Sequence, residues 1–155
     1  MTTVLTSAGE RAVAVPGGVL QLPGTLAWPA CPSEVVLFAH GRGRGRLSPR
    51  NIAVARQLRA AGLATLLLDL LTPEEAEVGA KVFEVTLLAK RLRTATDWVV
   101  TQREVAGLVP GYFGASTGAA HLFDEPGTLE EAGRWAAEWL VEHLAMVPRW
   151  QAMWR

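Results

Sequence analysis

The sequence predicts an α/β protein of three layers, in which helices cover both faces of a mostly parallel sheet of about five strands. Two observations support this fold class. Short apolar runs rich in β-branched residues alternate with longer segments whose apolar residues recur every three or four positions. Near the N-terminus, two apolar segments are instead separated by glycines and prolines, which is typical of an antiparallel hairpin. With 155 residues, of which 50% are hydrophobic, we expect a single domain over residues 1–155.

The strands are predicted from the apolar runs and the turn residues that separate them. Segments 11–15 and 18–28 are expected to form a hairpin of edge strands. The run EVVLFAH at 34–40 is typical of a strand that is buried on both faces, so it is expected to be central and parallel. A second buried run, LATLLLDL, occupies residues 63–70, and residues 108–115 are expected to return to the sheet.

The helices are predicted from apolar residues at helical spacing. Ser48 and Pro49 suit the beginning of a first helix and Gly62 its end. The apolar residues of this helix are Ile52, Ala55, Leu58 and Ala61. A longer amphipathic helix is expected from a second set, which is Val85, Leu88, Leu92, Ala95 and Val99.

A third helix is expected near the C-terminus. Thr128 and Glu131 match the capping-box pattern, and apolar residues follow at helical spacing. Trp135 and Trp139 lie on that apolar face and are interpreted as core residues rather than ligand contacts.

Composition disfavours several classes of partner. The 15 basic and 15 acidic residues cancel, which gives no reason to expect nucleic acid or an anionic membrane. No stretch approaches the ~20 apolar residues of a membrane span, and residues 1–9 do not match a signal peptide, so we expect a cytoplasmic protein. Cys31 is the one cysteine, which leaves no internal disulfide or thiolate cluster. We interpret Cys31 as a structural loop residue and expect no metal or organic cofactor.

The strongest chemical motif follows the last predicted strand. Residues 114–118 read GASTG, the G-x-S-x-G pattern of a nucleophile elbow. Such a turn is sharp enough to require small flanking residues, here Gly114 and Gly118, and it raises the hydroxyl of Ser116 above the sheet edge. The alternative is a glycine-rich turn from strand to helix that contains an incidental serine.

Acyl transfer also requires two backbone N–H donors for the developing oxyanion. Thr117 follows the predicted nucleophile and occupies the first donor position. The segment HGRG at 40–43 follows an earlier predicted strand, where the second donor is expected.

Four segments of the chain resemble dienelactone-hydrolase-type members of the α/β-hydrolase superfamily. They are VVLFAHGRGRGRLSPRN, ATLLLDLLTPEE, GYFGASTGAA and HLFDEPGTLEE, they occur in family order, and the likeness covers most of residues 11–145. The resemblance implies an esterase-type serine hydrolase for a small ester or lactone. It further implies that Ser116 is the nucleophile, that His121 is the general base, and that the backbone N–H groups of Arg42 and Thr117 form the oxyanion hole.

The resemblance also implies an internal deletion. In the family, further strands and helices follow the elbow helix and carry the catalytic acid, and the histidine comes near the end. Here GASTGAA runs directly into HLFDEPG, which indicates a truncated α/β-hydrolase fold without its C-terminal strands. On a continuous helix, His121 would lie ~7.5 Å along the axis from Ser116 and be rotated by ~140°, away from the hydroxyl. His40 and His143 are alternative bases, interpreted as a loop residue and a helix residue on a polar face.

No carboxylate occupies the expected place of the catalytic acid. Asp69 ends a predicted strand at the correct sheet edge, yet the resemblance marks it as an ordinary family position. Asp124 is close enough in sequence to orient His121, although a turn or capping role in DEPG is favoured. Asp97 lies within the long predicted helix and is expected to be solvated.

Three hypotheses of function follow. The first is a serine hydrolase, and the second is a catalytically inactive remnant that folds or self-associates without turnover. The third treats GRGRGR at 41–46 as an anion-binding loop, but Arg46 occupies the place of the third glycine in a dinucleotide motif. The missing strands would leave an exposed sheet edge beside the elbow, which would favour a homo-oligomer. Trp150 and Trp154 either contribute to such a contact or pack locally.

Overall fold

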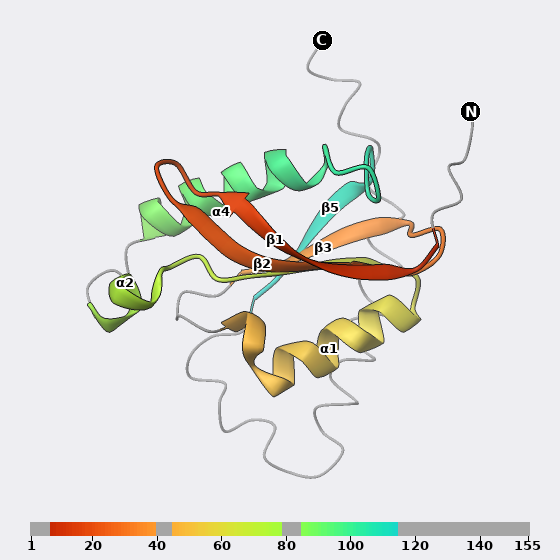
Figure 1. Cartoon of the computed structure of the whole chain (residues 1–155). Helices are drawn as coiled ribbons and strands as arrows, with labels where there is room; N and C mark the ends of the chain where they lie inside the picture. The colour runs from red at the N-terminus through yellow and green to blue at the C-terminus, as the bar shows by residue number, and fades with distance from the viewer. Residues whose placement is uncertain (1–6, 40–44, 79–84, 115–155) are drawn as a thin grey trace.

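The structure is a computed structural model that describes residues 7–39, 45–78 and 85–114 (Figure 1). In these ranges the chain forms a five-stranded sheet with strand order β1-β2-β4-β3-β5. Helix α4 covers one face of the sheet and α1 covers the other, so the predicted three layers are confirmed (Figure 1). The elements are β1 (Gly9–Pro16), β2 (Gln21–Trp28), β3 (Glu34–Phe38), the 3-10 helix η1 (Gly45–Leu47), α1 (Pro49–Ala60), β4 (Ala64–Leu68), α2 (Pro73–Glu77), α4 (Val85–Val99) and β5 (Val109–Phe113).

Strands β1 and β2 form the predicted antiparallel hairpin, but only β1 is an edge strand. Gly17 N–H donates to the carbonyl of Leu20 at 2.9 Å to close the turn. Strand β2 also pairs antiparallel with β4, with Gly24 opposite Leu68. The prediction of two edge strands was therefore wrong for β2. A Cβ at Gly24 would lie 3.0 Å from Val13 Cγ2 and 3.2 Å from the Leu67 carbonyl oxygen, so a small residue allows β2 to pack between its neighbours.

Strand β3 is central and parallel, as its apolar sequence predicted. It pairs in parallel with β4 on one side and with β5 on the other. All five residues of β4 and four of the five in β3 are buried. Both faces of these strands are covered by helices, which explains why their sequences are mostly apolar rather than alternating.

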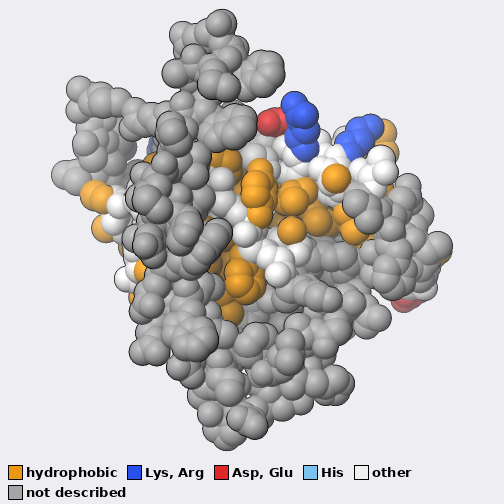
Figure 2. All heavy atoms as spheres, turned by 180° about the vertical axis from the view of Figure 1, so that it is seen from behind, with side chains coloured by type: hydrophobic (Ala, Val, Ile, Leu, Met, Phe, Trp, Pro, Cys, Tyr) orange, Lys and Arg blue, Asp and Glu red, His pale blue; other side chains and the backbone are white. Residues whose placement is uncertain are grey.

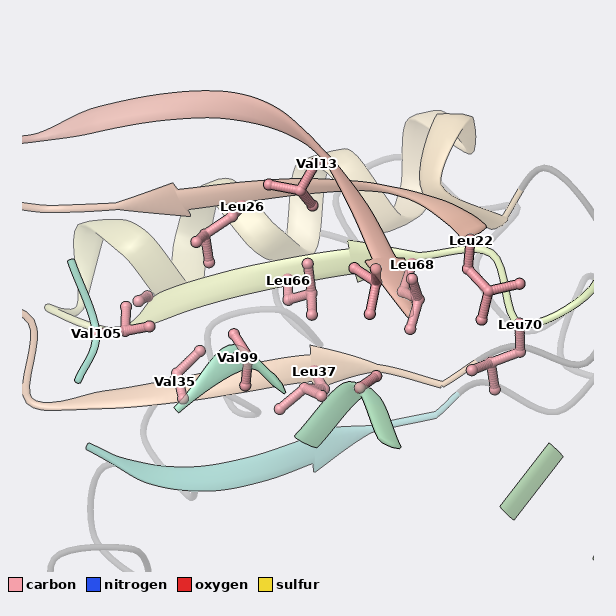
Figure 3. Packing of buried hydrophobic residues seen from close by; sticks show 13 residues of the cluster. Val13, Leu22, Leu26, Val35, Leu37, Leu66, Leu68, Leu70, Val99 and Val105 are labelled. Carbon is pink, nitrogen blue, oxygen red and sulfur yellow. The ribbon is translucent and has the colours of Figure 1, made fainter. Parts of the chain in front are cut away.

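The alternation of side chains along each strand divides the core into two layers. Val35 and Leu37 of β3 face α4, where they join a cluster that includes Ala95 and Val99 (Figure 3). Val36 and Phe38 face α1 and pack with its three buried apolar residues, which are Val54, Ala55 and Leu58. The apolar interior thus fixes the register of the central strands, because a shift by one residue would exchange the two layers.

Helix α1 begins and ends where the sequence predicted. Ser48 is the N-cap residue and Pro49 the first helical residue, although the Ser48 side chain accepts no capping hydrogen bond. At the other end, Gly62 has φ 89° and its N–H donates to the Arg59 carbonyl, while Leu63 N–H donates to the Leu58 carbonyl. These two bonds form a Schellman motif, in which glycine readily adopts the left-handed conformation.

The described apolar faces of α1 and α4 agree with the prediction except at one position of α1. Ala61 is exposed and lies beyond the last turn of α1, so its assignment to the apolar face was wrong; Val54 is buried instead. On α4 the predicted face is confirmed for Ala95 and Val99, which are buried. Asp97 is exposed on α4, as expected.

Cys31 lies in the loop between β2 and β3. Its thiol is exposed and its φ is 54°, in the left-handed region that non-glycine residues adopt uncommonly. The predicted loop position of this cysteine is confirmed.

Glu104 connects the segment after α4 to the edge strand β1. Its carboxylate lies 3.4 Å from the Arg11 guanidinium and 3.8 Å from that of Arg103. Burial alone would raise the pKa of Glu104. The hydrogen bonds from its own backbone N–H and from Arg11, together with the two positive charges, outweigh burial and lower this pKa below its ordinary value.

This shift predicts a pH-dependent contribution to stability. Ionised Glu104 stabilises the folded state above its unfolded pKa of about 4.3, and the contribution is lost as pH falls through the lower folded pKa. We therefore expect the stability difference between wild type and Glu104→Gln to shrink between pH 6 and pH 3, measured by urea unfolding. In an Arg11→Met background the difference at pH 6 should be smaller. A difference that is independent of both pH and Arg11 would contradict this account.

Candidate active site

Strands β3 and β5 are neighbours that end at the same edge of the sheet. Phe38 is paired with Phe113 at the last position of each strand. Their rings lie 5.0 Å apart between centroids, and Ala39 N–H donates to the Phe113 carbonyl at 2.9 Å. The segment that begins the predicted oxyanion loop and the segment that begins the predicted elbow therefore leave the sheet side by side.

Gly114 is the one residue of the predicted site that lies within the described ranges. It is exposed, and a Cβ there would lie 3.5 Å from the Ala39 carbonyl oxygen, which is an ordinary contact. Its described neighbours therefore do not by themselves require glycine. The other predicted site residues lie outside the described residues, and they are Arg42, Ser116, Thr117, Gly118 and His121. His40 also lies outside the described residues. So do the other C-terminal residues named in the sequence predictions, which are Asp124, Thr128, Glu131, Trp135, Trp139, His143, Trp150 and Trp154.

The chain after the predicted oxyanion loop is held by two buried polar residues. Asn51 of α1 donates from Nδ2 to the Gly45 carbonyl at 2.7 Å. Asp69, which directly follows β4, accepts the backbone N–H of Arg46 through Oδ1 at 3.0 Å. Its other oxygen, Oδ2, lies 3.0 Å from Arg46 Nε. The end of β4 and the first turn of α1 thus converge on Gly45 and Arg46.

These contacts change the interpretation of two residues. Both oxygens of Asp69 contact Arg46, and the Asp69 side chain is 8% exposed, so its carboxylate serves to hold a loop. Arg46 is ion-paired within the chain, which weighs against the hypothesis of an anion-binding GRGRGR loop. Sequence reasoning missed Asn51, although a polar residue on the buried face of a predicted helix is a signal for a specific partner.

An ion pair between buried Arg91 and partly buried Glu75 lies at the same edge of the sheet. Arg91 of α4 donates to the Leu70 carbonyl at 2.8 Å, and two of its nitrogens contact the two carboxylate oxygens of Glu75 at 2.5 and 2.9 Å. Glu75 also accepts from Thr72 N–H, and Thr72 Oγ1 accepts from Glu75 N–H, which completes a capping box at the start of α2. The T-x-x-E pattern of TPEE could have revealed this cap from the sequence.

Among residues 7–39, 45–78 and 85–114, no group of three or more His, Cys, Asp or Glu side chains is placed to hold a metal ion. Within the same ranges, none of the helices combines the length and apolar character needed to cross a membrane.

Similarity to solved structures defines the class of fold. No protein-family model matches the chain. A dienelactone hydrolase-like promiscuous phosphotriesterase from metagenomic libraries is 21% identical, with a TM-score of 0.55 over 70% of this chain and 49% of that one. At this identity the likeness shows the fold alone, which is that of an α/β-hydrolase.

A second structure shows the family. The crystal structure of a dienelactone hydrolase from Anabaena variabilis is 31% identical, with a TM-score of 0.77, and the match covers 88% of this chain and 99% of that one. The chain therefore belongs to the dienelactone hydrolase family.

Curated relatives match in sequence and support an internal deletion. A Mycobacterium tuberculosis protein, named provisionally as a phosphoribosyl transferase, is 33% identical over 207 residues. The match covers 87% of this chain and 47% of the relative, so the chain spans about half the length of the curated relatives it matches. The aligned span of 207 residues exceeds the whole chain of 155, which means that the relative carries a stretch within the match that this chain lacks.

Proposed function

We propose that this protein is a serine hydrolase that cleaves a small carboxylic ester or lactone. Ser116 is the nucleophile, His121 is the general base, and the backbone N–H groups of Arg42 and Thr117 stabilise the oxyanion. The observation that carries this proposal is the pairing of Phe38 with Phe113. Because of this pairing, the segment after β3 and the segment after β5 begin at adjacent positions on one edge of the sheet. A nucleophile elbow and its oxyanion loop require this arrangement.

The proposed reaction proceeds through an acyl-enzyme. The Ser116 oxygen attacks the carbonyl carbon while His121 accepts the hydroxyl proton, and the carbonyl oxygen becomes an oxyanion. Collapse of this intermediate breaks the ester bond, and the leaving alkoxide takes the proton from His121. A water molecule then repeats the sequence on the acyl group, which releases the carboxylic acid and restores Ser116.

Substitution of the nucleophile tests the proposal. We expect the wild type to hydrolyse a short-chain p-nitrophenyl ester, and Ser116→Ala to lose the rate by a factor of about 10³ or more. Ser33→Ala is the matched control, because Ser33 is exposed and directly precedes the first residue of β3, at the end of the strand far from the proposed site. Equal rates for wild type and Ser116→Ala would remove the enzymatic function.

The alternative is a hydrolase-like protein without turnover. It is favoured by the stretch that the relatives carry and this chain lacks, because in the resembled family the catalytic acid follows the elbow helix. A fluorophosphonate probe separates the two functions. Labelling of Ser116 supports the hydrolase, whereas a folded wild-type chain that remains unlabelled supports the inactive protein.

Self-association and a cytoplasmic location remain predictions. Among the described residues, β5 pairs only with β3, and Tyr112 of β5 is 51% exposed. Seen from behind, hydrophobic side chains gather on the described surface, with charged side chains along its upper border (Figure 2). A second copy of the chain that pairs with β5, on the side of β5 away from β3, would cover this strand and the exposed Tyr112.

A further inference from the structure

We draw no further inference here: the strongest candidate, the outer edge of strand β5 beside the exposed side chain of Tyr112, carries nothing beyond the self-association already predicted, because nothing in the described residues shows what covers that edge.

Discussion

Leu66→Ala is expected to lower the free energy of unfolding by about 2–5 kcal/mol. Leu66 is fully buried in β4, opposite Leu26 of β2 and Leu37 of β3, so it is the middle of a row that crosses three strands (Figure 3). Its removal leaves a cavity lined by rigid strands that cannot close around it. Urea unfolding measures the loss as a shift in the midpoint at constant slope.

The matched control for this variant is Leu47→Ala. Leu47 lies in η1 and is 56% exposed, so the same substitution there should change stability by about 0.5 kcal/mol or less. Similar losses for the two variants would contradict the assignment of Leu66 to the core.

Glu75→Gln is expected to destabilise the fold by about 3–5 kcal/mol. The substitution keeps the size of the side chain and an oxygen that can accept from Thr72 N–H, but it removes the charge that faces Arg91. The Arg91 side chain is 6% exposed, so its guanidinium would remain buried without this counter-charge. Chemical unfolding at neutral pH measures the loss.

Two comparisons isolate the charge effect. Glu74→Gln alters the exposed neighbour of Glu75 and should change stability by about 0.5 kcal/mol or less. Arg91→Met added to Glu75→Gln removes the buried cation and should recover part of the loss. If Glu75→Gln and Glu74→Gln behave alike, the pair does not stabilise the fold.

Most of the sheet and both main helices could be predicted from local pattern. The runs that became β3 and β4 are almost entirely apolar, with Glu34 and Thr65 as the exceptions, and Gly62 follows the end of α1 with a positive φ. The inner position of β2 could not be predicted in this way. In its pairing with β4, Gly24 lies opposite Leu68, although β3 and α1 separate the two strands in the sequence. No local sequence pattern encodes a contact at that separation.

The polar contacts at the sheet edge were less predictable than the strands. Asp69, Arg46 and Arg91 are charged residues, and sequence alone does not distinguish a buried, paired charge from a solvated one. The position of Arg91 partly indicated that this residue is buried, because it lies three residues after Leu88 on the apolar face of α4. Its partner Glu75 belongs to another helix, so the pair forms only when the two helices pack.

The central place of β3 has a consequence for the order in which the protein is synthesised. Strand β3 ends at Phe38, but its partners on either side are made later, and β5 is complete only at Phe113. A nascent chain on the ribosome therefore carries an apolar strand with an unpaired edge until most of the sheet has been translated. Such edges invite association between chains, so correct assembly depends on how soon the late strands arrive.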